Sequence, residues 1–226
     1  AAAACALVAG ACRCLSHIHQ HGLLHLDLRP ANILLGDGDT PILTDFGLAR
    51  SIHDANVDDW YYPHVAPEII ETGAGEIASD IWAMGMTLAH LLTGGAICRP
   101  FLTGLDLLEA SANGDWPRLG ELGIHVPVRL RKVIDKATRY RAADRQANVE
   151  QFKHELDRAT PKVSLMPDDN VLRSVDGEWT LAKALSKDGT CSVVTKRRGR
   201  QQSEFSVSGV TSRAADKKIT EVVTRL

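Results

Sequence analysis

Four polar residues suited to phosphoryl-transfer chemistry stand close together in the stretch LLHLDLRPANILLGDGDTPILTDFGLAR (residues 23–50). Moving a phosphoryl group from a nucleotide requires divalent metal ions on the phosphates, a cation that offsets developing charge, and a carboxylate that orients the attacking hydroxyl. Asp27 is the candidate carboxylate and Arg29 the candidate cation. Asn32 and Asp45 offer the hard oxygen ligands that Mg²⁺ prefers.

Two short apolar runs would position these groups. NILL (32–35) and PILTDF (41–46) predict β-strands, and the intervening GDGDT supplies the Gly and Asp residues of a tight turn. A hairpin between the runs would bring Asn32 and Asp45 together.

Helical signals dominate the rest of the first 160 residues. Ser79 is a candidate N-cap for an apolar helix that ends at Gly94, and Asn148 with Gln151 forms a candidate capping box. Residues 51–65 lack periodicity and predict an exposed loop. The expected helices cover about 1–20, 79–93, 103–112, 127–140 and 147–159.

The character of the sequence changes after Pro161, where Val, Thr, Ser, Lys and Gly become more frequent than helix formers. The predicted class is therefore α+β: a mainly helical unit with a small β element over 1–160, a linker over 161–175, and a β-rich tail over 176–226. The basic cluster TKRRGRQQ (195–202) lacks alternating aromatic residues, so it favours a solvated hairpin turn over a nucleic-acid surface.

Composition is that of an ordinary globular protein, with 44% hydrophobic and 24% charged residues. A formal net charge of -2 gives no reason to expect nucleic acid or an anionic membrane as partner. Five scattered cysteines predict a reducing compartment, and hence a cytoplasmic location.

The apolar opening AAAACALVAGACRCL has two interpretations, a signal peptide and a buried helix. Arg13 interrupts the run, which favours the helix and no membrane segment.

Five motifs, in order and at similar spacing, resemble those of the protein kinase family. HLDLRPAN resembles the catalytic-loop pattern His-Arg-Asp-x-Lys-x-x-Asn, and DFG follows it at the family's usual distance. APE would close an activation segment, SDIWAMG resembles the helix motif Asp-x-Trp-x-x-Gly, and a late Arg completes the set. The matched positions are 25–32, 45–47, 66–68, 79–85 and Arg145.

This resemblance implies a kinase large lobe over residues 1–159 that transfers the γ-phosphate of ATP to a protein hydroxyl with Mg²⁺. Asp27 would be the base, Arg29 the charge stabiliser, and Asn32 and Asp45 the metal ligands. The acceptor would be Ser or Thr, favoured slightly by Pro30 after the cation.

The resemblance also implies supporting residues. His25 would support the core, Asp80 would hold the catalytic-loop backbone, and Glu68 would pair with Arg145 in a buried ion pair.

Three positions depart from the family pattern. Leu26 replaces an Arg, which removes the usual clamp on an activation-loop phosphate. Arg29 replaces a Lys, so a planar guanidinium stands in place of a compact ammonium group. Tyr61 stands where Thr is usual, which leaves Tyr open as the acceptor.

A kinase also needs a small lobe, and we expect the parent protein to extend beyond this sequence. In the tail, LSKDGTCSVV (185–194) resembles a degraded Gly-rich loop, EFSVSGV (204–210) a third strand, and KKITEVVTRL (217–226) the start of a helix. The alternatives are a tandem kinase, a permuted domain, and an unrelated β-rich tail. The second functional hypothesis is a non-catalytic pseudokinase-like scaffold.

Overall fold

The computed structural model describes residues 1–57, 61–98, 104–117, 119–168 and 171–226. The chain divides into two compact units. The larger comprises Ala3–Leu122 and Arg131–Ala159, and the smaller comprises Ala1–Ala2, Gly123–Leu130 and Thr160–Leu226. The smaller unit is continuous from Thr160 onward, and the predicted domain bounds of 1–160 and 176–226 stay a prediction.

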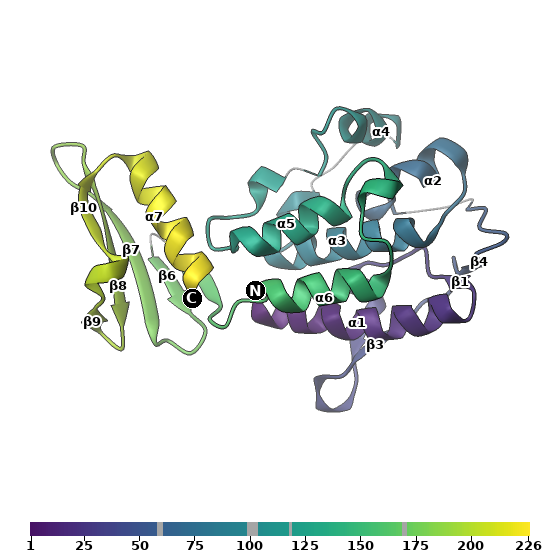
Figure 1. Ribbon diagram of the computed structural model, residues 1–226, viewed down its shortest axis with the longest axis horizontal. Helices are drawn as coiled ribbons and strands as arrows, with labels where there is room; N and C mark the ends of the chain where they lie inside the picture. Colours follow the sequence, from purple (N-terminus) through teal and green to yellow (C-terminus); the bar gives the residue numbers. More distant parts are fainter. Residues whose placement is uncertain (58–60, 99–103, 118, 169–170) are drawn as a thin grey trace. The chain divides into compact units, whose positions relative to one another are not determined.

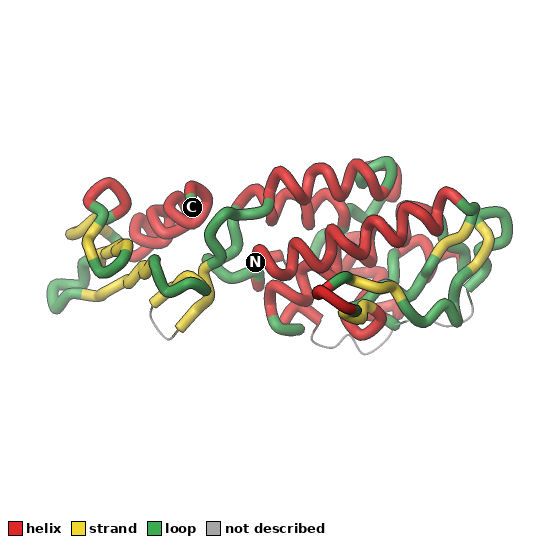
Figure 2. Tube along the Cα trace, turned by 90° about the horizontal axis from the view of Figure 1, so that it is seen from below, coloured by secondary structure: helices red, strands yellow, loops and turns green. Residues whose placement is uncertain are grey.

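Helices make up most of the larger unit (Figures 1 and 2). Two short antiparallel pairs complete it: β1 (Leu23–Leu24) with β4 (Arg50–Ser51), and β2 (Ile33–Leu35) with β3 (Pro41–Leu43). The helices are α1 (Ala2–Gln20), α2 (Pro67–Thr72), α3 (Ile77–Thr93), α4 (Gly104–Ala112), α5 (Val128–Ala137, which crosses the division between the units) and α6 (Val149–Ala159). Single 3₁₀ turns lie at η1 (Pro30–Asn32), η2 (Asp37–Asp39), η3 (Tyr62–His64), η4 (Ala96–Cys98), η5 (Leu119–Glu121) and η6 (Ala142–Asp144).

The first helix, α1, is a core helix. By length and composition alone it would also suit a membrane span, but its apolar stripe, which includes Val8, Cys12 and Leu15, is buried in the protein. Gly10 permits the β2–β3 hairpin to approach, because a Cβ at this position would lie 2.3 Å from the Pro41 ring. Apolar spacing therefore places α1 directly behind the hairpin that carries the candidate site.

The buried helix α3 begins two residues earlier than predicted. Its N-cap is Glu76, and Ser79 is the N3 residue of a capping box: the Glu76 side chain accepts from the Ser79 backbone, and the Ser79 hydroxyl accepts from Glu76 N at 3.0 Å. Ser79 thus caps from inside the helix and not from the N-cap position. Gly94, at φ 59°, ends the helix as expected.

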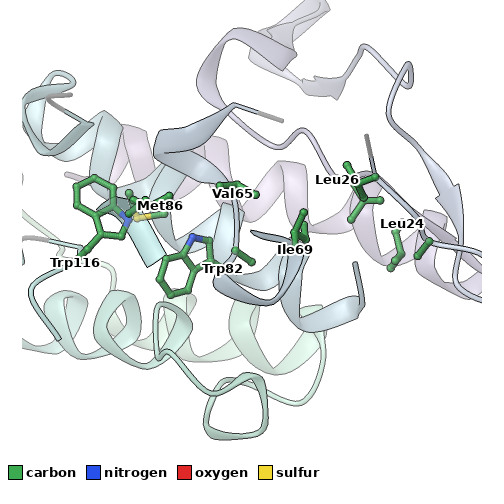
Figure 3. Close-up of a cluster of buried hydrophobic side chains, with 11 residues drawn as sticks. Leu24, Leu26, Val65, Ile69, Trp82, Met86 and Trp116 are labelled. Carbon is green, nitrogen blue, oxygen red and sulfur yellow. The ribbon is translucent and has the colours of Figure 1, made fainter. Parts of the chain in front are cut away.

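The apolar cluster beneath the candidate site joins α3 to the segments on either side of it (Figure 3). Trp82 and Met86 come from α3, and Val65 and Ile69 come from the chain around the start of α2. Leu24 and Leu26 extend the cluster to the loop after α1; Ala55, Val57, Ala66, Leu107 and Trp116 complete its buried members.

The Thr160–Leu226 part of the smaller unit, where the structure describes it, comprises an antiparallel sheet and helix α7 (Ser212–Arg225). Among the described residues the strand order is β10-β8-β7-β6-β5, with β9 paired to β8. The strands are β5 (Leu165–Asp168), β6 (Val171–Ser174), β7 (Trp179–Leu185), β8 (Cys191–Arg197), β9 (Arg200–Gln201) and β10 (Val207–Val210), with a 3₁₀ turn η7 at Ser203–Phe205. A helical portion followed by an antiparallel tail confirms the α+β class.

The prediction of a linker over 161–175 is wrong, because β5 and β6 both lie within it. The polar residues between these strands suggested an open segment. However, Leu165 and Leu172 are buried in the same cluster as Ile219 of α7. Burial of these two leucines in the cluster with α7 therefore outweighs the polar composition of this segment.

The basic cluster at 195–202 lies at the turn between β8 and β9, as predicted. Arg198 and Gly199 have φ angles of 49° and 77°, the left-handed backbone of a tight hairpin. The sequence from β7 through β8 and β10 to α7 also follows the strand–turn–strand–strand–helix order expected of the tail. Its relation to a kinase small lobe stays a prediction.

Candidate active site

Asp27, Arg29 and Asn32 are brought together by a tight turn. The 3₁₀ turn η1 folds the chain back, with Asn32 N donating to Arg29 O at 3.0 Å. The Asn32 amide then donates from Nδ2 to Asp27 Oδ2 at 2.6 Å and to Asp27 O at 2.8 Å. Arg29 Nε lies 3.8 Å from Asp27 Oδ1. The loop therefore places a carboxylate, a guanidinium and an amide side by side.

A buried carboxylate from α3 holds the start of this loop. Asp80 is 0% exposed. Its Oδ1 accepts from Leu26 N at 2.8 Å, and its Oδ2 accepts from His25 N at 2.9 Å and from His19 Nε2 at 2.8 Å. Leu26 has φ 65°, a left-handed conformation that costs free energy for a bulky residue and persists where its surroundings fix it. The Asp80 carboxylate supplies that fixation with charge-assisted hydrogen bonds.

His25 joins the catalytic loop to the segment that carries Asp45. The imidazole is fully buried; its Nε2 donates to Thr44 O at 3.1 Å and its Nδ1 accepts from Asp27 N at 3.3 Å. These two partners assign a neutral ring with its proton on Nε2. The ring centroid also lies 4.9 Å from that of Phe46. His25 therefore connects the loop of Asp27 to the segment of Asp45.

The β2–β3 hairpin places Asp45 next to Asn32. Ile33 pairs with Leu43 in register, and Thr44 N donates to Asn32 O at 3.0 Å. Asp45 is thus one residue beyond the partner of Asn32. Its φ is 60°, and its Oδ1 accepts from Gly47 N at 3.3 Å.

The donor set of these two residues fits a magnesium ion. Both Nδ2 hydrogen bonds of Asn32 go to Asp27, which leaves the amide oxygen as its metal-binding atom. Asp45 is exposed, and its second carboxylate oxygen remains for a ligand. Hard oxygens on neighbouring backbone positions are the type of ligand that Mg²⁺ takes from a protein.

Tyr61 covers Arg29, a contact that the sequence analysis missed. The Arg29 guanidinium carbon lies 4.6 Å from the centroid of the Tyr61 ring, within the range of a cation–π interaction. The sequence analysis notes Tyr61 as a substitution for Thr, but the two residues are 32 positions apart and no local pattern signals their contact. This contact ties the segment before α2 to the catalytic loop.

Leu26, which stands where the family pattern has Arg, packs among apolar side chains. Leu26 is buried in the cluster of Figure 3 with Val65 and Ile69. Gly75 makes room for it, since a Cβ there would lie 2.5 Å from Leu26 Cδ2. An Arg at position 26 would therefore enter an apolar environment in this chain.

Glu68 and Arg145 form a bidentate ion pair, with Nη1–Oε1 at 2.7 Å and Nη2–Oε2 at 2.8 Å. The Arg145 side chain is wholly buried. Its other hydrogen bonds go to backbone oxygens of Ala78, Arg139 and Tyr140. The pair fastens the start of α2 to α3 and to the loop after α5.

His64 provides a second link to the catalytic loop. Its Nδ1 donates to Leu28 O at 3.1 Å. Burial, with a smaller contribution from the neighbouring His90, lowers the pKa of His64 to about 3, so the imidazole is neutral near pH 7. The sequence analysis did not single out this residue, because its partner is 36 positions away.

Comparison with known proteins agrees with the motifs. The family described as Protein kinase domain matches residues 2–155. Serine/threonine-protein kinase PknL of Mycobacterium tuberculosis (strain CDC 1551 / Oshkosh) is 28% identical over 158 residues, 67% of this chain and 39% of that protein. Serine/threonine-protein kinase AtPK1/AtPK6 of Arabidopsis thaliana is 29% identical over 143 residues, 62% of this chain and 30% of that protein.

A similar segment occurs in Tyrosine-protein kinase Fgr of Rattus norvegicus, which is 34% identical over 109 residues, 44% of this chain and 20% of that protein. The chain thus spans at most 39% of the length of these three relatives. The Thr160–Leu226 part of the smaller unit lies outside the family match. Since the match covers more than half of the sequence and its motif residues converge on one site, the chain belongs to the protein kinase domain family.

Proposed function

We propose that the larger unit carries the catalytic groups of a kinase that transfers the γ-phosphoryl group of ATP to a protein Ser or Thr hydroxyl. The observation that carries this proposal is the Asp27–Asn32 contact at 2.6 Å, with Asp80 fixing the loop on one side and Asp45 following on the other. A turn with a purely structural role has no chemical need for this set of side chains.

Each group has a distinct role in the proposed reaction. Asp27 accepts the proton of the incoming hydroxyl and, through Asn32, keeps its carboxylate orientation. Arg29 offsets negative charge on the transferred group. Asn32 and Asp45 would hold Mg²⁺, which would neutralise negative charge on the phosphates. Positioning and electrostatics supply most of the rate in such a transfer, because little covalent chemistry falls to the protein.

An exposed apolar surface on the hairpin supports nucleotide binding. Leu34 and Ile42 pair across β2 and β3 and are 54% and 46% exposed. They lie between Asn32 and Asp45 along the chain, so a base packed on this surface would leave its phosphates close to the metal ligands. Large apolar side chains left exposed together are typical of a surface that a ligand covers.

Two of the reported relatives support Ser or Thr as the acceptor, since their names describe serine/threonine kinases. Their sequence identity to this chain is 28% and 29%, and a tyrosine kinase matches a shorter segment. A cytoplasmic location, expected from cysteine usage, stays a prediction; none of the five cysteines forms a disulfide in the structure.

A non-catalytic, pseudokinase-like scaffold is the second candidate function. The segment LSKDGTCSVV (185–194) favours it, because a small lobe with Ser186, Asp188 and Cys191 in place of Gly residues would not easily bring backbone N–H groups close to phosphates. The retained set of Asp27, Asn32 and Asp45 favours the enzyme.

Asp27→Asn separates the two functions in the protein that contains this chain. The amide keeps the shape of the side chain and an acceptor for Asn32, but it cannot take a proton. We expect kcat for phosphotransfer from ATP to fall about 10²–10⁴-fold, the usual contribution of a general base, with the unfolding midpoint unchanged. Asp135→Asn is the matched control, because Asp135 is an exposed residue of α5 paired with Arg139. Equal phosphotransfer by wild type and Asp27→Asn would remove Asp27 as the base, and a folded wild type without phosphotransfer would leave the scaffold.

A further inference from the structure

Three side chains with soft or borderline donor atoms meet beside the catalytic loop. His64 comes from η3, His90 from the last turn of α3, and Cys98 from η4. His64 Nε2 lies 3.2 Å from His90 Nδ1, and Cys98 Sγ lies 3.3 Å from His90 Nδ1 and 3.7 Å from His64 Nε2. Among the residues that the structure describes, no other group of His, Cys, Asp and Glu converges in this way.

Two glycines return the chain so that Cys98 can reach His90. Gly94 and Gly95 have φ angles of 59° and 86°, which L side chains rarely adopt. A Cβ on Gly95 would also lie 3.2 Å from His90 Nε2. Gly95 N donates to His90 O at 2.9 Å, and Cys98 N donates to Gly95 O at 3.0 Å. The turn therefore fixes the sulfur against the imidazole of the helix it has just left.

The three distances match the edges of a zinc coordination tetrahedron. Zinc binds imidazole nitrogen at about 2.0–2.1 Å and thiolate sulfur at about 2.3 Å, so tetrahedral angles put two nitrogens about 3.3 Å apart and nitrogen and sulfur about 3.6 Å apart. The observed N–N distance is 3.2 Å, and the two N–S distances are 3.3 and 3.7 Å. The ligands thus need little movement to bind a metal ion.

His64 is already oriented by an outer hydrogen bond. Its Nδ1–H donates to Leu28 O at 3.1 Å, and the Thr87 hydroxyl donates to the same oxygen at 3.3 Å. A backbone carbonyl on one imidazole nitrogen leaves the other nitrogen with its lone pair free for a metal, the usual arrangement for a metal-binding His. His64 is 4% exposed, so its ring is held in place by packing as well.

We propose that His64, His90 and Cys98 bind one Zn²⁺ ion. Two imidazoles and one thiolate suit Zn²⁺ among common divalent ions, since Mg²⁺ and Ca²⁺ prefer oxygen. On binding, a Zn–S bond forms, the S–H bond breaks, and the thiol proton leaves to the solvent. A fourth position remains for water or another ligand.

Such an ion would fasten the segment before α2 to the end of α3. His64 also contacts Leu28 O in the catalytic loop, so the site lies one hydrogen bond from the backbone between Asp27 and Arg29. This proposal is independent of phosphoryl transfer, because it rests on donor atoms that the proposed reaction does not use.

Cobalt is the first probe of the site, in the full 226-residue chain. One equivalent of Co²⁺ should produce a thiolate-to-cobalt charge-transfer band and tetrahedral ligand-field bands, which Zn²⁺ then removes. Cys98→Ser should abolish the charge-transfer band and weaken binding about 100-fold or more. Cys14→Ser is the matched control, because Cys14 and Cys98 are the two partly exposed cysteines and Cys14 lies elsewhere, on α1.

Alkylation of the unaltered chain gives a test that does not depend on a variant folding. With Zn²⁺ present, we expect iodoacetamide to modify Cys98 about ten-fold more slowly, as located by peptide mass, while Cys14 reacts at an unchanged rate. A missing cobalt band, a band that survives in Cys98→Ser, or equal Cys98 alkylation with and without Zn²⁺ would each overturn the proposal. The cluster would then be a hydrogen-bonded one in which the Cys98 thiol donates to His90.

Discussion

Replacing Asp80 by Asn tests how the catalytic loop is held. The carboxylate accepts three hydrogen bonds, from Leu26 N on Oδ1 and from His25 N and His19 Nε2 on Oδ2. An Asn keeps one oxygen and replaces the other by an NH₂ group. With the oxygen at the Oδ2 position, two hydrogen bonds remain without their ionic character, and the Leu26 N–H faces another donor.

The size of the effect follows from these contacts. Leaving a buried donor unpaired costs about 1–3 kcal/mol, and hydrogen bonds to a charged acceptor are roughly twice as strong as neutral ones. The free energy of unfolding of the larger unit should therefore fall by about 2–4 kcal/mol. Leu26 also loses the contact that fixes its φ of 65°, so its backbone amide should exchange with solvent faster than in the wild type.

Urea unfolding followed by tryptophan fluorescence measures this loss. Trp179 lies in the smaller unit, so a Trp179→Phe background leaves the signal to tryptophans of the larger unit, among them Trp82 and Trp116. Asp135→Asn is the control, because this exposed carboxylate pairs with Arg139 at the surface and such pairs contribute about 0–1 kcal/mol. A loss in Asp80→Asn no greater than in the control, with unchanged Leu26 amide exchange, would refute the reasoning.

Two further predictions concern buried charge and pH. Arg145→Met leaves the Glu68 carboxylate without its bidentate partner, so the same urea assay should show a loss of about 3–5 kcal/mol; a loss below that of Asp135→Asn contradicts the pair's importance. His64 has its pKa lowered to about 3 by burial and by His90. Between pH 6.5 and about 3, the His64 imidazole is therefore protonated in the unfolded chain and neutral in the folded one. Lowering the pH from 7 to 5 should then lower the free energy of unfolding by about 2 kcal/mol. With chelator present, His64→Gln should lower the number of protons taken up on unfolding near pH 5 by about one, as measured from the slope of the free energy of unfolding against pH. An unchanged slope contradicts the prediction.

Sequence patterns predicted the elements whose signals are local. Residues Val8, Cys12 and Leu15 recur at helical spacing, and all three are buried on α1. Asn148 caps α6 as expected, with Gln151 N donating to its Oδ1 at 2.8 Å. Short motifs also predicted that one hairpin brings Asn32 and Asp45 together, since each stands beside a strand signal.

Two kinds of feature were missed: short elements with weak local signals, and contacts between residues far apart in the sequence. The six residues of α2 give too few turns for periodicity to show, and β5 and β6 pair within a segment of polar composition. His64 and Cys98 are 34 positions apart, and their contact depends on the Gly94–Gly95 turn and on the packing of α3. No local pattern encodes such a contact, so the structure was needed to find it.

The most direct test of the central claim is Mg·ATP binding, measured by calorimetry on the protein that contains this chain. The account predicts binding that requires Mg²⁺ and is lost in Asp45→Ala, with Asp135→Asn binding like the wild type. Binding of equal strength in the wild type and Asp45→Ala, or no Mg²⁺-dependent binding to the folded protein, would contradict the assignment of Asn32 and Asp45 as the ligands of a catalytic metal ion.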